Sequence, residues 1–440
     1  VYHLVMPRAY LDAGRIAYLP WIVMTGMPQA TEMLHTWAMA LGGSEAATTL
    51  VWFIGLVACA GLLGYLRRAW DARAAWVGLA ALLGGYTPVK LLSGGYVDWT
   101  VFLYALGALA LLETWRKEGN NRALLAAGLF TGLAVGAKYT SGVLALAGLA
   151  VVLWIGRRQG KKVLLSALRY GLPALIAALP WFARNALATG NPLYPFFFTG
   201  GAVTPLRLAV YQHLPPWGNW MDVLLLPFRA TLLGADSGDG YMFSAGPLLL
   251  GLGLLAWLLP GQFTPAQRIN RGLTSLLGAV GLAAWALGNQ LSGNLIQTRY
   301  YFSIFPAFAA LAAAGDFLLR QVNLPRVRRE RVGAALVLLV LGLNALEAGS
   351  AVLKQGAPQA ALGLKSQSAY LAENLGWFQP AMQAVGDLPE GQRALHRTRV
   401  CERHQSLEHQ VQGEGRPQVV PVHDGPAAGL ELSGPIPSGT

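Results

Sequence analysis

The chain has 440 residues, of which 54% are hydrophobic and 12% charged, and its mean hydropathy is +0.43. One soluble core would leave most of that apolar surface in water, so the composition excludes an ordinary soluble globule. The formal net charge is +12, but the basic residues form short clusters between apolar stretches, a pattern that indicates membrane topology and not nucleic-acid binding. The two cysteines, Cys59 and Cys401, form neither a disulfide framework nor a metal pair by their spacing.

About ten apolar stretches are long enough to cross a bilayer, and only helices or closed barrels satisfy the backbone there. The stretches are continuous apolar runs without strand-like alternation, so we predict an all-α, polytopic transmembrane protein. The predicted spans are residues 45–66, 74–92, 97–114, 122–137, 140–156, 164–183, 244–260, 272–289, 300–319 and 332–349.

Clusters of Arg and Lys recur at every second connection, as expected for cytoplasmic loops. The alternate connections, including a long loop at 184–243, are therefore predicted to face outward. We expect an outward juxtamembrane segment at 1–43, a transmembrane domain at 44–350 and a short outward segment at 351–385. The chain opens without Met in an outward segment, so a further span is expected before Val1.

Two terminal regions depart from this pattern. Residues 1–43 are interrupted by prolines and glycines from Pro7 to Pro28, which predicts short interfacial helices and no span. Residues 386–440 lose hydrophobic periodicity, which favours disorder or a non-native tail such as the product of a shifted reading frame. Their four histidines lack metal-ligand spacing.

Two acidic residues stand at outward positions close to the membrane, where an unpaired charge is costly. Asp98 lies in Gly94-Gly95-Tyr96-Val97-Asp98-Trp99, and Glu32 lies in Thr31-Glu32-Met33-Leu34. Each has an ordinary structural explanation: Asp98 can cap a helix, and Glu32 can complement a helix dipole. The alternative is that both serve an outward-facing site.

Three basic residues, Lys138, Arg184 and Arg299, lie at outward span ends against the charge rule. One such residue alone is an interface anchor, whereas three on one face predict a phosphate site. Asp12, Asp236 and Asp239 are weaker candidates, and we expect Asp236 and Asp239 to be solvated in a flexible polar loop. The sequence has no Walker A, GxSxG, HExxH or Rossmann motif, which argues against soluble nucleotide chemistry.

Several stretches resemble membrane glycosyltransferases of the GT-C fold, specifically the family 39 relatives of protein mannosyltransferases and aminoarabinose transferases. The resemblance rests on Tyr2-His3-Leu4, Thr31-Glu32-Met33-Leu34, Gly132 to Thr140, Pro180-Trp181 with Arg184-Asn185, Gly190 to Pro195, and Arg299-Tyr300 with Pro306. It implies transfer of a sugar from a polyprenyl-phosphate donor to a protein, lipid or glycan acceptor outside the cytoplasmic membrane. The chemistry implied is a carboxylate base with positive charge on the leaving phosphate.

The resemblance also implies roles for particular residues. Glu32 and Asp98 would be acidic residues that orient the acceptor or hold a divalent metal ion, and no other cofactor is implied. The donor phosphate would be bound by Lys138, Tyr139, Arg184, Arg299 and Tyr300. The family's main catalytic acid is expected just before Val1. Trp217, Trp220 and Tyr211 in the long loop would stack on a sugar or anchor at the interface.

Two other functions remain open from the sequence. A transporter or flippase of lipid-linked substrates would show internal repeats and interrupted helices, and no repeat is visible. A non-catalytic membrane scaffold would leave the five charged candidates far apart in space.

Overall fold

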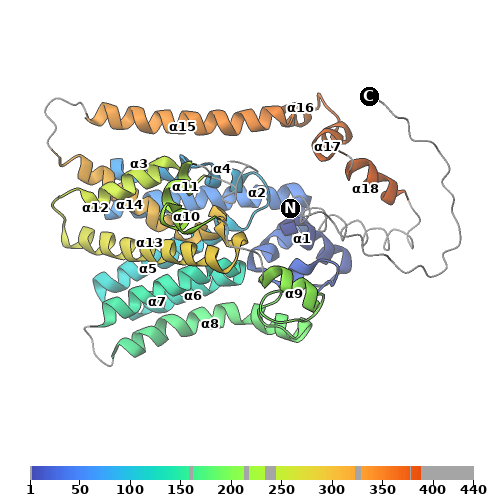
Figure 1. Cartoon of the computed structure of the whole chain (residues 1–440), viewed down its shortest axis with the longest axis horizontal. Helices are drawn as coiled ribbons and strands as arrows, with labels where there is room; N and C mark the ends of the chain where they lie inside the picture. Colours follow the sequence, from blue (N-terminus) through green and yellow to red (C-terminus); the bar gives the residue numbers. More distant parts are fainter. Residues whose placement is uncertain are drawn as a thin grey trace. The chain divides into compact units, whose positions relative to one another are not determined.

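The computed structural model describes residues 2–157, 162–212, 218–232, 244–322, 329–376 and 378–387. The chain divides into two compact units, Val1–Pro358 and Gln359–Thr440. Every regular element in the described ranges is a helix, and the one extended contact there is a bridge between Gly200 and Val203. The all-α prediction is therefore confirmed (Figure 1).

In the described residues, the first unit contains fifteen α-helices and four 3-10 helices before the short helix α16 (Ala357–Ala361) at its boundary. They are α1 (Tyr2–Ala13), η1 (Val23–Gly26), α2 (Ala30–Ala69), α3 (Ala72–Leu83), α4 (Tyr86–Leu92), α5 (Asp98–Glu118), α6 (Asn121–Ala137), η2 (Tyr139–Ser141), α7 (Gly142–Gly156), α8 (Lys162–Thr189), α9 (Pro205–Gln212), α10 (Trp220–Leu224), α11 (Leu226–Leu232), α12 (Pro247–Leu258), α13 (Pro265–Leu291), η4 (Gly293–Ile296), η5 (Thr298–Ile304), α14 (Phe305–Leu319) and α15 (Arg329–Lys354). The second unit contains α17 (Gln367–Leu375) and α18 (Phe378–Gly386).

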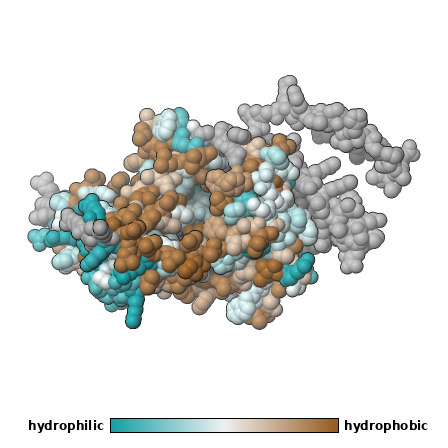
Figure 2. Space-filling view, turned by 90° about the horizontal axis from the view of Figure 1, so that it is seen from below, coloured by the Kyte–Doolittle hydropathy of each residue, from teal (hydrophilic) through white to brown (hydrophobic). Residues whose placement is uncertain are grey.

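The chain is a multi-pass membrane protein. Six helical segments of the described chain are long and apolar enough to cross a membrane, and α3 with α4 forms a seventh candidate that is bent by 74°. Each of the ten predicted spans falls on a helix or on this bent pair, with α6 and α12 as shorter apolar helices. The exposed surface of the bundle carries many large apolar side chains, and Figure 2 shows a broad hydrophobic area beside a hydrophilic end.

Helix α2 is broken near the predicted boundary between its interfacial and spanning parts. Gly42 and Gly43 have non-helical backbone angles, and Gly43 has a φ of 73°, which glycine adopts without a Cβ clash. The break separates the segment that carries Glu32 from the apolar run that follows.

Helices α6 and α8 approach one another closely because α6 presents a stripe of small residues, Gly128, Gly132 and Gly136. A Cβ on Gly132 would lie 2.1 Å from the backbone oxygen of Ala174, so no larger residue fits without moving the helices. Such spacing is typical of tightly packed membrane helices. The contact brings the end of α6 and the end of α8 to the same end of the bundle.

The bend between α3 and α4 leaves backbone groups without helical partners, and distant side chains bind them. Asn344 of α15 donates to the carbonyl oxygens of Leu83 and Gly85, at 2.6 and 3.1 Å. The backbone N–H groups of Tyr86 and Thr87 donate to the hydroxyl and to the carbonyl oxygen of Ser244, at 3.2 and 3.1 Å. These bonds hold the bend that leads into the turn before Asp98.

Candidate functional site

Several helix ends meet at one end of the first unit, which we call the Asp98 end. Helix α5 begins there with Asp98, α6 ends there before Lys138, and η5 begins there before Arg299. The opposite end, which we call the arginine-rich end, carries the basic clusters at the end of α2 and at the connection between α5 and α6. The Asp98 end is the one predicted to face outward.

Asp98 forms a buried ion pair and does not cap its helix. The N-cap position of α5 is Val97, without a side-chain cap, so the capping explanation of Asp98 is wrong. Instead, Lys138 Nζ donates to Asp98 Oδ1 at 2.6 Å, and the two side chains are 14% and 1% exposed. The pair arises because α5 and α6 are packed neighbours and run in opposite directions.

Arg299 and Lys138 lie on the same aromatic ring. The Lys138 ammonium is 5.0 Å from the centroid of the Tyr300 ring, and the Arg299 guanidinium is 5.2 Å from it. Arg299 also lies 5.8 Å from the ring of Tyr96 and donates through Nε to Gln297 Oε1 at 3.0 Å. Two cations therefore lie close to one aromatic ring, which attracts both.

Glu32 lies in the first turn of α2 and is 2% exposed. Its Oε1 lies 2.6 Å from His3 Nδ1 on α1. Helix α1 continues through Pro7, where the sequence predicts an interruption. Because Pro7 has no N–H for the carbonyl oxygen of His3, that oxygen is available to His35, whose Nδ1 donates to it at 3.3 Å. The proline thus helps to join α1 to α2 around Glu32.

His3 is 4% exposed and close enough to the Asp98 ion pair to be influenced by its charges. Burial lowers the pKa of His3 to about 3; the charge of Asp98 opposes this effect, and those of Lys138 and Arg299 add to it. The His3 ring is therefore uncharged near neutral pH. The His3 ring also lies 6.4 Å from the ring of Tyr96, which contacts Arg299. The bonded pair of His3 and Glu32 therefore lies beside the aromatic residues that contact the two cations.

Arg184 of α8 joins the same end through α1. Its Nη2 donates to the hydroxyl of Tyr10 at 3.3 Å, and that hydroxyl donates to Gln29 Oε1 at 2.7 Å. The guanidinium lies 6.0 Å from the ring of Trp181. Arg184 is thus held at the junction of α1, α2 and α8, on a different element from the Lys138 pair.

Tyr139 follows Lys138 in sequence, but its hydroxyl is used for structure. It accepts from Asn185 Nδ2 at 3.0 Å and donates to the backbone oxygen of Tyr194 at 3.0 Å. These bonds tie the turn after α6 to the end of α8 and to the loop that follows.

Several buried polar atoms at the Asp98 end have no hydrogen-bond partner among the described residues. They include Glu32 Oε2, Asp98 Oδ2, His35 Nε2, Arg184 Nη1 and Thr298 Oγ1. Orphaned buried groups are costly, so polar atoms of this kind are expected to meet a ligand or water. Acceptors and donors are both represented, as binding of a sugar phosphate requires.

The two carboxylates do not fit a metal site by themselves. Glu32 directs one oxygen at His3, and Asp98 directs one oxygen at a lysine ammonium, which competes with a cation. In the described ranges no group of three or more His, Cys, Asp and Glu side chains is arranged to hold a metal ion.

The structure brings together more residues than the sequence singled out. His35, Tyr96, Tyr10 and Gln29 were not candidates, and His3 entered only through the family resemblance. One signal was present: His35 follows Glu32 by three residues and therefore shares its helix face.

The remaining candidates lie elsewhere. Asp12 pairs with Arg8 on an exposed surface, and the Trp220 side chain is 68% exposed. Trp217, Asp236, Asp239 and the tail histidines lie outside the described residues, as does the side chain of Tyr211.

The fold and the buried site define the class: an all-helical, multi-pass membrane protein with paired carboxylate and basic side chains at one end of its bundle. Residues 28–183 match the family model described as dolichyl-phosphate-mannose-protein mannosyltransferase. This match confirms the predicted resemblance to GT-C membrane glycosyltransferases. The matched stretch contains Glu32, Asp98 and Lys138 and ends one residue before Arg184.

Two solved structures are similar to the chain. ArnT from Cupriavidus metallidurans, bound to undecaprenyl phosphate, is 17% identical with a TM-score of 0.49, over 87% of this chain and 65% of that chain. The same protein in the apo state is 16% identical with a TM-score of 0.48, over 87% and 64%. The chain therefore spans less than two thirds of the length of these structures. No curated protein matches it in sequence.

Proposed function

We propose that this protein is a glycosyltransferase that moves a sugar from a polyprenyl-phosphate donor to an acceptor at the outer side of the cell membrane. The proposal rests on one observation: two cations, Lys138 and Arg299, both contact the ring of Tyr300 beside the buried Asp98. The matched family's description names a dolichyl-phosphate sugar, which is a donor of this chemistry.

The phosphate of the donor is assigned to the three basic residues Lys138, Arg299 and Arg184. Among the described residues no carboxylate forms an ion pair with Arg299, and an ammonium has three donors, of which Asp98 takes one from Lys138. Arg184 presents Nη1 as a further donor. Such donors stabilise the negative charge that grows on the phosphate as the sugar leaves. Both Lys138 and Arg299 contact the ring of Tyr300, and Tyr139 is bonded to Asn185, the neighbour of Arg184 in sequence.

Glu32 and Asp98 are assigned to the binding of substrate hydroxyl groups. Glu32 Oε2 and Asp98 Oδ2 are buried acceptors without partners in the described chain. In the reaction, the acceptor oxygen forms a bond to the anomeric carbon of the sugar. The bond between that carbon and the phosphate oxygen breaks, and its electron pair leaves with the polyprenyl phosphate. The hydroxyl proton passes to a carboxylate, and Glu32 and Asp98 orient the two hydroxyl-bearing substrates for this step.

The orientation follows from charge. The basic clusters of the arginine-rich end favour the cytoplasm, so the Asp98 end and its site face outward. Apolar surface surrounds the bundle, and a lipid-linked donor reaches such a site from the bilayer. The acceptor can be a protein, a lipid or a glycan.

The test uses proteoliposomes that contain the protein and labelled polyprenyl-phosphate sugars, with cell-envelope extract as the source of acceptors. We expect label to leave the lipid, and Asp98→Asn with Arg299→Gln to abolish the transfer. The matched control is Asp12→Asn with Arg15→Gln, which alters an exposed acid and an exposed arginine.

Two other results would overturn the proposal. Label that changes leaflet without leaving the lipid would identify a flippase. A folded protein that neither transfers nor binds the lipid would identify a scaffold.

A further inference from the structure

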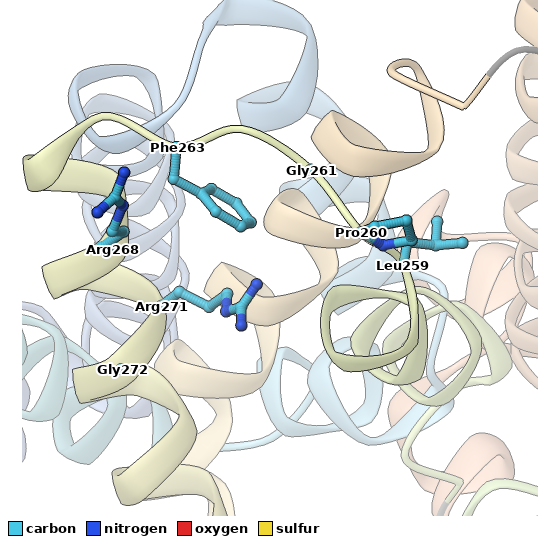
Figure 3. Close-up of a pocket in the computed structure, with 7 residues that line it drawn as sticks. All are labelled: Leu259, Pro260, Gly261, Phe263, Arg268, Arg271 and Gly272. Atoms are coloured by element: carbon cyan, nitrogen blue, oxygen red, sulfur yellow. The ribbon is translucent and has the colours of Figure 1, made fainter.

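A cavity of about 520 Å³ lies at the arginine-rich end, away from the Asp98 end, and the proposed transfer does not use it. It is formed by the loop between α12 and α13 and by the first turns of α13 (Figure 3). Its lining residues are Leu259, Pro260, Gly261, Phe263, Arg268, Arg271 and Gly272.

The charges of this cavity are unbalanced. Arg268 and Arg271 both line it, and in the described chain no carboxylate forms an ion pair with either. By contrast, Arg320 at the same end bonds Asp316 at 3.1 Å. Positive charge in the first turns of a helix is also opposed by the helix dipole. An anion bound in this cavity would offset both effects.

Phe263 positions one of the two arginines. The Arg271 guanidinium lies 4.7 Å from the centroid of the Phe263 ring, and Phe263 packs in turn against Trp70 at 6.0 Å. Figure 3 shows Arg271 and Phe263 reaching toward the same space from α13 and from the loop. Because the ring occupies a face of the guanidinium, its N–H edge remains for a phosphate, which arginine binds with two parallel bonds.

Exposed apolar side chains adjoin the cavity. Trp257 and Leu258, directly before the lining loop, are 57% and 73% exposed. On the other side, a Cβ on Gly272 would lie 3.7 Å from Trp154 of α7, itself 43% exposed. Exposed tryptophans of membrane helices are typical of the headgroup level.

We propose that this cavity binds a phosphate-bearing anion through Arg268 and Arg271, and that the headgroup of an anionic phospholipid is its source. The site is independent of the proposed transferase site and lies at the opposite end of the bundle. A free phosphate compound shares the chemistry, but the adjoining apolar, tryptophan-bearing surface favours a lipid.

The test places the whole chain in nanodiscs of phosphatidylcholine with a minor fraction of phosphatidylglycerol. Native mass spectrometry then counts the phosphatidylglycerol retained by each variant. We expect Arg268→Gln with Arg271→Gln to reduce retention by about tenfold, as loss of charge-assisted bonds implies. Arg268→Lys with Arg271→Lys should give an intermediate value, because lysine keeps the charge without the paired bonds. Arg67→Gln with Arg68→Gln, two exposed arginines at the same end, is the matched control and should retain the lipid.

The second arm identifies the source. The thermal midpoint of unfolding is measured in nanodiscs of phosphatidylcholine alone. It is then measured after addition of inorganic phosphate, and in nanodiscs that also contain phosphatidylglycerol. A rise with phosphatidylglycerol but not with phosphate supports the lipid. A rise with phosphate alone would replace the lipid by a free phosphate compound. The proposed site would be overturned if the Arg67 and Arg68 control lost as much phosphatidylglycerol as the Arg268 and Arg271 variant. It would also be overturned if the unchanged protein did not retain phosphatidylglycerol in preference to phosphatidylcholine.

Discussion

Lys138 Nζ lies 2.6 Å from Asp98 Oδ1, with both side chains largely buried, at the point where α6 ends and α5 begins. These residues are forty positions apart in sequence, and each is unfavourable near a membrane without the other. Together they offset part of that cost, and Asp98 Oδ2 is left without a hydrogen-bond partner in the described chain.

The first prediction concerns the stability of this pair. Lys138→Met should destabilise the protein by about 3 kcal/mol, because it leaves a buried carboxylate without its cation. Combining it with Asp98→Asn should restore most of the loss. Thermal unfolding in detergent measures both, and Asp12→Asn, in an exposed pair, should change the midpoint little. Equal midpoints for the single and double variants would show that the two residues are not coupled.

The second prediction concerns the donor phosphate. Arg299→Gln should reduce transfer from the lipid-linked donor by roughly 10² to 10³-fold, the usual effect of removing one group that stabilises developing negative charge. Its unfolding midpoint should stay close to that of the unchanged protein, since Arg299 has no carboxylate partner in the described chain. The measurement is label transfer in proteoliposomes, with Arg15→Gln as the exposed control. Transfer at the ordinary rate would remove Arg299 from the site.

The third prediction concerns pH. Burial lowers the pKa of His3 to about 3 from the ordinary 6.5. The unfolded chain therefore binds more protons than the folded one between these values, and stability rises with pH across that window. On acidification below about pH 6.5 this group should cost up to about 1.4 kcal/mol per pH unit.

His3→Gln should remove this contribution. Burial also raises the pKa of Glu32, the partner of His3, so that group stabilises the folded state as pH falls and opposes His3. The unfolding midpoint of the variant should therefore rise less steeply with pH than that of the unchanged protein, or fall with pH, between neutral and mildly acidic conditions. The matched comparison is the unchanged protein over the same range. An identical slope in both would mean that His3 is protonated in the folded protein, contrary to its buried position.

The fourth prediction concerns the packing that positions the site. Gly132→Val should force α6 away from α8, because even a Cβ would lie 2.1 Å from the backbone oxygen of Ala174. We expect a lower unfolding midpoint and, in the folded fraction, weaker transfer, since Lys138 and Arg184 follow the two helices. The control is Gly171→Ala in α8, where a Cβ meets nothing within 4 Å. That change should be neutral or stabilise by about 0.5–1 kcal/mol. Equal effects of the two substitutions would contradict the close contact.

The spans could be predicted from sequence because each depends on one continuous apolar run. The runs at 272–289 and 300–319 fall within α13 and the η5–α14 segment. The continuation of α1 through Pro7 could not be predicted in the same way. It depends on a bond from His35 to the carbonyl oxygen that the proline leaves free.

The site was only partly predictable for a related reason. Asp98, Lys138 and Arg299 were conspicuous because charge is rare at those positions, and their types indicated paired acidic and cationic sides. Tyr96 and Tyr10 were not conspicuous, because aromatic residues are common near membrane interfaces. Only their contacts with Arg299 and Arg184 distinguish them.

The sequence by itself therefore determined the membrane class, the helical spans and the asymmetry of charge, since hydrophobic burial and the positive-inside rule act on local composition. Only the tertiary structure decided that Lys138 neutralises Asp98, that His3 binds Glu32 and that Arg299 remains without a carboxylate partner in the described chain. Those relationships depend on which helix ends become neighbours. That choice is made by side-chain volume along whole helices, as at Gly132 against Ala174, and no local pattern of charge specifies it.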